Sequence, residues 1–138
     1  MNTTTKTRLG AKKGIIMKYL DLLARVRECK IKAEAAANAL SKASNSGNIR
    51  EKESAKKQYF RYEHEYKVLR SEATEMIRTS EDKELMRALM LRRVDLMPWE
   101  KIIRSICTNR SEMDMRADAY IYIKANHGPD WGNYSDCF

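Results

Sequence analysis

The chain has 138 residues, of which 43% are hydrophobic and 33% are charged, and its net charge at pH 7 is +8. This mixture is typical of amphipathic helices with solvated faces, and the length fits one domain or a small module with an appended coiled coil. Five glycines and two prolines are too few for the turns of a β-sandwich or barrel. We therefore expect an all-α protein without a large core that encloses a ligand.

The three cysteines, Cys29, Cys107 and Cys137, are odd in number and far apart, and no CxxC pair occurs. Neither a disulfide framework nor a zinc site is indicated, and free thiols point to a reducing compartment. No apolar signal region opens the chain, and no run approaches the ~18 apolar residues of a membrane span. We expect a cytoplasmic protein (in the host cytoplasm if phage-encoded) that does not bind a membrane.

The positive charge is concentrated in the N-terminal third. Residues 1–47 hold ten Lys/Arg against three acids, a net of +7; residues 48–79 hold eight against six, and residues 80–138 hold nine against ten. Such a surface can attract a nucleic acid or an acidic protein, although a basic surface can also serve only solubility.

Residues 1–14 are polar and lack apolar periodicity, so we expect a flexible basic arm. A helix is predicted over residues 15–43, because its apolar positions recur in steps of three and four. They are Ile16, Leu20, Leu23, Val26, Cys29, Ala33, Ala36, Leu40 and Ala43. Residues 44–48, rich in Ser and Asn around Gly47, predict a break.

A second helix is predicted from this break to about Arg78, with an apolar stripe in alternating steps of four and three that is typical of a heptad seam. The stripe comprises Ala55, Tyr59, Tyr62, Tyr66, Leu69, Ala73 and Met76. A short loop between two long amphipathic helices favours an antiparallel coiled-coil hairpin over residues 15–79. We interpret the tyrosines as core, packed against alanines of the first helix; the alternative is a platform on which bases stack.

Residues 80–127 predict a small module of short helices. Ser80 is expected to cap a helix that runs to about Asp95, and Pro98 to be the first residue of the next. That short helix should bury Trp99, Ile102, Ile103 and Ile106.

Asn109 and Glu112 form a candidate capping box for the last helix, which should end near Asn126. Residues 119–123 alternate like a strand, but no partner strand is predicted, so we expect helix. The aromatic tail, residues 128–138, is expected to fold back as a cap on the helices or to be an exposed docking peptide.

A short helix, a turn and a longer helix form the pattern of a helix-turn-helix. Within it, one segment resembles the fourth region of primary sigma factors, and more closely small phage proteins that place such a module after a coiled coil. The segment is LRRVDLMPWEKIIRSICTNR, and its matching residues are Leu91, Arg92, Val94, Asp95, Trp99, Glu100 and Ile102, with Asn109 at the capping position. The resemblance implies a DNA-binding module and RNA polymerase as a partner.

The segment departs from that pattern at several positions. Arg93 replaces its tyrosine, Ile103 a small residue, and Leu96 and Cys107 replace its two glycines. The helix expected to read DNA carries Arg110 and Arg116 against three acids, which oppose contact with phosphate, although acids can accept hydrogen bonds from cytosine. A module retained as a protein-binding surface is therefore the alternative to DNA binding.

We expect ten basic residues to contact nucleic acid, from the arm, the first helix, the short helix and the last helix. They are Lys6, Arg8, Lys12, Lys13, Lys18, Arg25, Lys101, Arg104, Arg110 and Arg116. His64 and His127 do not pair by spacing with a nucleophile or a carboxylate, and no phosphate-binding loop or metal motif occurs. We expect no enzyme activity, catalytic residue, cofactor or metal.

Three functions remain open. The first is a phage or mobile-element DNA-binding transcriptional regulator, with a homodimer through the hairpin and RNA polymerase as further partners. The second is an inhibitor or adaptor that binds a nucleic-acid-bound host protein, for example an anti-CRISPR protein. The third is a packaging component like a terminase small subunit.

Overall fold

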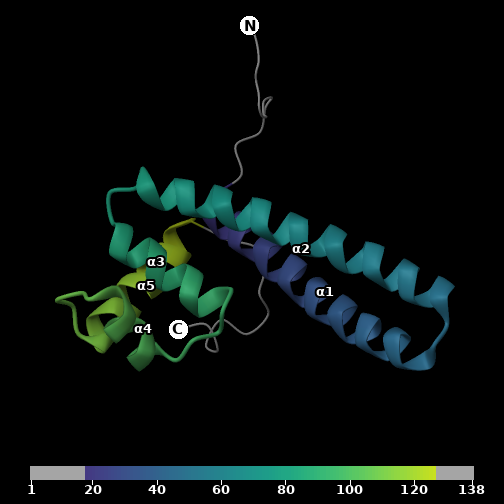
Figure 1. The fold of residues 1–138 in the computed structure, drawn as a ribbon. Coiled ribbons are helices and arrows are strands. Elements are labelled where there is room, and N and C mark those ends of the chain that lie inside the picture. Colours follow the sequence, from purple (N-terminus) through teal and green to yellow (C-terminus); the bar gives the residue numbers. More distant parts are fainter. Residues whose placement is uncertain (1–17, 127–138) are drawn as a thin grey trace, which may run out of the picture.

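The structure, a computed structural model, describes residues 18–126, and this part of the chain forms helices without a strand. The elements are α1 (Tyr19–Ser46), α2 (Ile49–Arg78), α3 (Lys83–Arg93), α4 (Trp99–Ile106) and α5 (Glu112–Asn126). α1 and α2 form a long antiparallel hairpin, and α3–α5 gather at the end where α1 begins and α2 ends (Figure 1). The all-α prediction, a hairpin followed by short helices, is confirmed. The basic arm (1–14) and the aromatic tail (128–138) lie outside the described residues.

The hairpin turn is tighter than the predicted five-residue break. α1 continues to Ser46, whose hydroxyl donates a 2.8 Å hydrogen bond to the Ala43 carbonyl. Gly47 then takes a left-handed conformation with φ of 78°, which a glycine adopts without a steric cost. The side-chain oxygen of Asn48 accepts from the Glu51 amide at 3.1 Å and so caps α2. One glycine and one cap therefore reverse the chain.

The two faces of the hairpin seam are buried to different degrees. The predicted apolar residues of α1 from Leu20 onward are buried, apart from the half-buried Leu40. On α2 only Ala73 of the predicted stripe is fully buried, and Tyr59, Tyr62 and Tyr66 are half-buried. In residues 18–126 the hairpin is only two helices wide at this point, so no third helix of the described chain covers these rings. The core interpretation of the tyrosines is right only in part.

All five helices contribute to one hydrophobic core at the end of the hairpin where α3–α5 gather. Its large, fully buried apolar side chains are Leu20, Leu23, Val26, Leu89, Ile102 and Met115. Residues 119–123 are helical, as predicted, and Ala119 and Ile123 bury one face of α5. The hairpin and the module thus depend on the same buried surface.

Asp95, in the connection from α3 to α4, joins the hairpin to the module. Its carboxylate accepts two hydrogen bonds from the Arg70 guanidinium of α2, at 3.0 and 2.8 Å, and one from Lys30 Nζ of α1 at 3.1 Å. Arg70 also donates to the Tyr66 hydroxyl at 2.9 Å. A bidentate contact of this kind fixes the orientation of the two side chains as well as the distance between them.

The helix starts differ from prediction by one or two residues. Asp82, not Ser80, caps α3 by accepting from the Leu85 amide at 3.1 Å. The Ser80 hydroxyl instead donates to the Ile77 carbonyl at 2.9 Å and closes the end of α2. Pro98 occupies the capping position of α4, so that Trp99 is the first helical residue.

The predicted capping box of α5 is wrong. Ser111 Oγ, not Asn109, accepts from the Asp114 amide at 3.1 Å. Glu112 accepts from Arg116 at 3.3 Å, one turn further along the same helix. Pattern alone favours either Asn109 or Ser111 as a cap; the turn after α4 decides which one reaches the free amides.

We expect Asp95→Asn to lower the free energy of unfolding at pH 7 by about 1.5–3 kcal/mol, the range for hydrogen bonds to charged groups. Burial alone would raise the pKa of the Asp95 carboxyl, but the hydrogen bonds and charges of Arg70 and Lys30 outweigh burial and lower that pKa. The stabilisation is therefore present above the unfolded-state pKa of about 3.9 and is lost as the pH falls through the folded-state value.

Urea unfolding of parent and variant across this pH range measures the effect. The matched control is Glu63→Gln, which removes an exposed pair within α2 (Glu63 Oε1 to Lys67 Nζ, 3.3 Å) worth at most about 0.5 kcal/mol. Equal losses for the two variants at pH 7 would contradict the role of Asp95.

Candidate nucleic-acid interface

Two non-glycine residues with a left-handed backbone flank α4. Leu96 has φ of 54°, and Cys107, which ends α4, has φ of 53° and ψ of 47°. The first bend is held because the Met97 amide donates to the Leu91 carbonyl at 3.1 Å, and the Arg92 guanidinium donates to the Met97 carbonyl at 3.1 Å. An L-residue in this conformation costs roughly 1–2 kcal/mol. Both are positions at which the sigma-like pattern has glycine.

α4 is amphipathic, and the charged side chains of its outer face are Glu100, Lys101 and Arg104. Trp99 and Ile102 are buried in the core, whereas Lys101 and Arg104 are exposed. Neither cation makes an ion pair with another side chain in residues 18–126. Spaced three residues apart, they lie on one face of the helix. Two of the predicted contact residues are therefore available to an external anion.

Arg110, in contrast, is engaged inside the module. Its guanidinium lies 2.6 Å from Asp82 Oδ2, 3.5 Å from Asp118 Oδ2 and 4.0 Å from Glu84 Oε1. The hydrogen bond to Asp82 is the main reason that the pKa of Arg110 is raised. The residue joins the start of α3 to α5, so its role as a free DNA contact is not supported by this geometry.

The outward face of α5 is mixed, with exposed apolar, acidic and basic side chains. Met113 is 79% exposed and Ile121 64% exposed, with Tyr120 on the same side of the helix at 45%. Arg116 is within 3.3 Å of Glu112, and the exposed Asp114 stands between them in the sequence. A phosphate approaching this helix would meet an arginine already paired with Glu112, and Lys124, whose Nζ lies 5.5 Å from the centroid of the Tyr120 ring.

The remaining predicted contacts lie on and before the hairpin. Lys18, the capping residue of α1, and Arg25 are exposed and lie seven positions apart in the sequence, so they are on one side of α1. The arm cations Lys6, Arg8, Lys12 and Lys13 lie outside the described residues. The structure thus places the described candidates on three separate helices and in the turn before α5.

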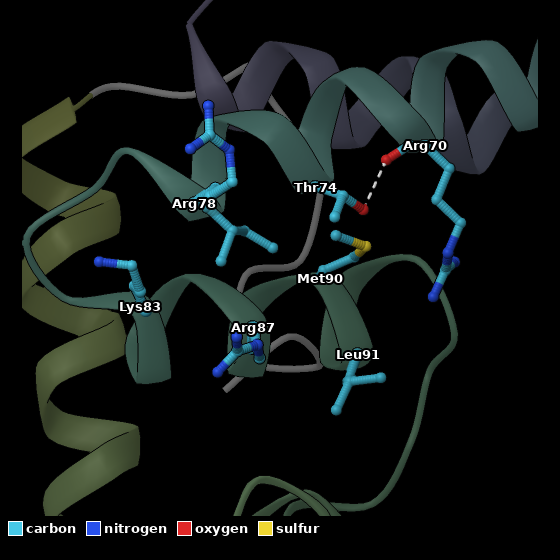
Figure 2. A pocket seen from close by; sticks show the side chains of 8 residues that line it. Arg70, Thr74, Arg78, Lys83, Arg87, Met90 and Leu91 are labelled. Carbon is cyan, nitrogen blue, oxygen red and sulfur yellow. Dashed lines mark hydrogen bonds between the residues drawn. The ribbon is translucent and has the colours of Figure 1, made fainter.

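A basic groove between α2 and α3 was missed by sequence reasoning. Arg70 and Arg78 of α2, with Lys83 and Arg87 of α3, line a cavity of about 370 Å³. Its other lining residues are Thr74, Ile77, Met90 and Leu91. Figure 2 shows Arg78, Lys83 and Arg87 at one end and Arg70 at the other, with Met90 between them. The available signal was the one-turn spacing of Arg70, Thr74 and Arg78 and of Lys83 and Arg87.

We expect Leu96→Gly and Cys107→Gly each to raise the free energy of unfolding by about 0.5–1 kcal/mol. Glycine removes the left-handed strain, and this gain exceeds the extra entropy that glycine gives the unfolded chain. Both side chains are exposed, so little burial is lost. Ala117→Gly, at an exposed position within α5, is the control and should cost about 1 kcal/mol. Thermal and urea unfolding measure all three; destabilisation by the first two would contradict strain at these bends.

Comparisons with protein-family models, with curated proteins and with solved structures give no match. Within the described part of the chain, no helix has the length and apolar character needed to cross a membrane. Residues 18–126 also contain no group of three or more His, Cys, Asp or Glu side chains placed to hold a metal ion. What the chain does is therefore inferred from its residues and their geometry.

Proposed function

We propose that the chain is a small DNA-binding regulator of phage or mobile-element type, acting in the host cytoplasm through α4 and α5. The observation that carries this proposal is the pair of left-handed bends at Leu96 and Cys107. They flank α4 at the two positions where the sigma-like pattern has glycine, so the backbone bends where a helix-turn-helix of that kind requires it. The resemblance and the geometry here support each other.

In a helix-turn-helix, the first helix of the pair crosses the DNA backbone and the second enters the major groove. Lys101 and Arg104 of α4 are free to contact phosphates, and the basic arm is positioned before α1 in the sequence to add others. α5 offers Lys124 and Arg116, of which Arg116 is already paired with Glu112, and Arg110, in the turn before α5, is held by Asp82. Affinity should therefore come mainly from phosphate contacts, with weak discrimination between bases.

A second candidate function is an adaptor or inhibitor that binds a protein carrying nucleic acid. The outward side chains Met113, Tyr120 and Ile121 favour it, because exposed apolar side chains grouped on one helix face are typical of a protein-binding surface. In either function, RNA polymerase or a second copy of the chain, joined through the hairpin, is a further partner.

The test is a titration of random and promoter-like duplexes at two salt concentrations. Lys101→Gln/Arg104→Gln should reduce the slope of log affinity against log salt by about 2, since each lost phosphate contact removes about 0.9. The arm variant, with Lys6, Arg8, Lys12 and Lys13 changed to Gln, should weaken binding to every sequence.

The matched control is Lys52→Gln/Lys56→Gln, which removes two exposed charges near the far end of the hairpin and should leave the slope nearly unchanged. Equal effects of the α4 and control variants would contradict binding through the module. If the parent bound no duplex at any salt concentration, the regulator proposal would fail, and the adaptor or inhibitor would become the favoured function.

A further inference from the structure

The groove between α2 and α3 differs from the α4–α5 surface because it is concave and has an apolar floor. Ile77 and Met90 are 4% and 6% exposed and form this floor, with the half-buried Leu91 beside them. Its volume of about 370 Å³ lies in the range typical of pockets for small organic ligands. A flat basic patch would attract anions but would not offer a buried apolar surface next to them.

The cations of the groove differ in how strongly other groups of the protein hold them. Arg70 is held by Asp95 and is needed for the contact between hairpin and module. Arg78 donates to Glu75 and remains largely exposed, and Lys83 Nζ donates to the Ser80 carbonyl at 3.3 Å. Arg87 makes no hydrogen bond or ion pair with another side chain in residues 18–126. Three cations at one end of the groove can therefore turn toward an anion without breaking the fold.

These groups fit a ligand with a multiply charged anion at one end and a flat apolar body at the other. A guanidinium binds two phosphate oxygens in a bidentate contact, and a lysine adds a point charge. The Met90 side chain supplies a thioether, which packs well against aromatic rings. The Thr74 hydroxyl donates to the Arg70 carbonyl at 3.0 Å, which leaves its oxygen free to accept from an amino group on a base.

We propose that the α2–α3 groove binds a nucleotide, with its phosphates at Arg78, Lys83 and Arg87 and its base over Met90 and Leu91. The nucleotide could be free in solution or be one unit of a single strand, since both present the same phosphate and base. This site is separate from the α4–α5 surface and does not require that surface to bind DNA.

The test is calorimetric titration of the full chain with adenosine triphosphate, adenosine, inorganic phosphate and a short single-stranded oligonucleotide. We expect the triphosphate to bind more tightly than either adenosine or inorganic phosphate, because only it engages both ends of the groove. Arg87→Gln and Lys83→Gln should each weaken its binding about tenfold, the lower end for a charge-assisted hydrogen bond. Arg87→Lys should retain part of the affinity.

The matched control is Lys56→Gln, which removes one exposed charge from α2 far from the groove and should change the affinity less than about twofold. Unfolding curves check that the exposed Arg87 and Lys83 variants keep the parent stability. An oligonucleotide that binds more tightly and is displaced by the triphosphate would identify a strand as the source; one that does not compete would identify a free nucleotide.

Two outcomes would overturn the proposal. The first is no binding of either the triphosphate or the oligonucleotide. The second is equal weakening by Lys56→Gln and Arg87→Gln, which would mean attraction to overall charge. If Lys101→Gln/Arg104→Gln lost duplex binding but kept nucleotide binding, the result would support the groove site and show that it is independent of duplex binding by α4 and α5.

Discussion

The carboxylate of Asp95 is the point at which three parts of the chain meet. It accepts hydrogen bonds from Lys30 of α1 and Arg70 of α2 while it sits in the connection from α3 to α4. The shared core supplies most of the burial, but burial is non-directional and does not by itself fix the angle between the hairpin and the module. The paired Asp95–Arg70 contact does fix it, and it also holds Arg70 at the edge of the groove.

Positive charge in this protein is divided between structural and available groups. Arg70 and Arg110 each bridge two parts of the fold, and both have a raised pKa because a carboxylate accepts their hydrogen bonds. A charge used in this way contributes little to the field that attracts nucleic acid. Lys101, Arg104 and Arg87 are exposed without ion pairs among the described residues, so the surfaces that carry them are the ones from which binding is inferred. Net charge alone would not separate the two kinds.

The C-terminal module has the backbone path expected of a helix-turn-helix but a different set of side chains along it. Its bends at Leu96 and Cys107 follow the path expected of a helix-turn-helix, but without the glycines that make such a path inexpensive. Its last helix keeps the length of a recognition helix, while its outward face presents the apolar side chains Met113, Tyr120 and Ile121. Strain of this kind persists where the surroundings determine the backbone, and at Leu96 the hydrogen bonds of Met97 with Leu91 and Arg92 do so. The module can thus keep its backbone while the surface that it presents changes.

The sequence by itself determined the helices. Their apolar periodicity predicted the two long helices of the hairpin, because spacing along one helix is a local property. The Ser- and Asn-rich run around Gly47 predicted the break between them, and the absence of a partner strand favoured helix over strand for residues 119–123. It misplaced the caps at Ser80 and Asn109, since Asp82 and Ser111 are comparable candidates and only the turn geometry selects between them.

Tertiary structure alone decided which cations face which partners. Arg110 could not be separated from Arg104 by pattern, because its acidic partner Asp82 lies 28 residues earlier in the chain. The groove could likewise not be predicted, since Arg70 and Arg87 line one cavity only when α2 and α3 pack together. Periodicity defines the apolar face of each helix. Which faces pack together depends on contacts between residues far apart in sequence, and no single segment encodes those contacts.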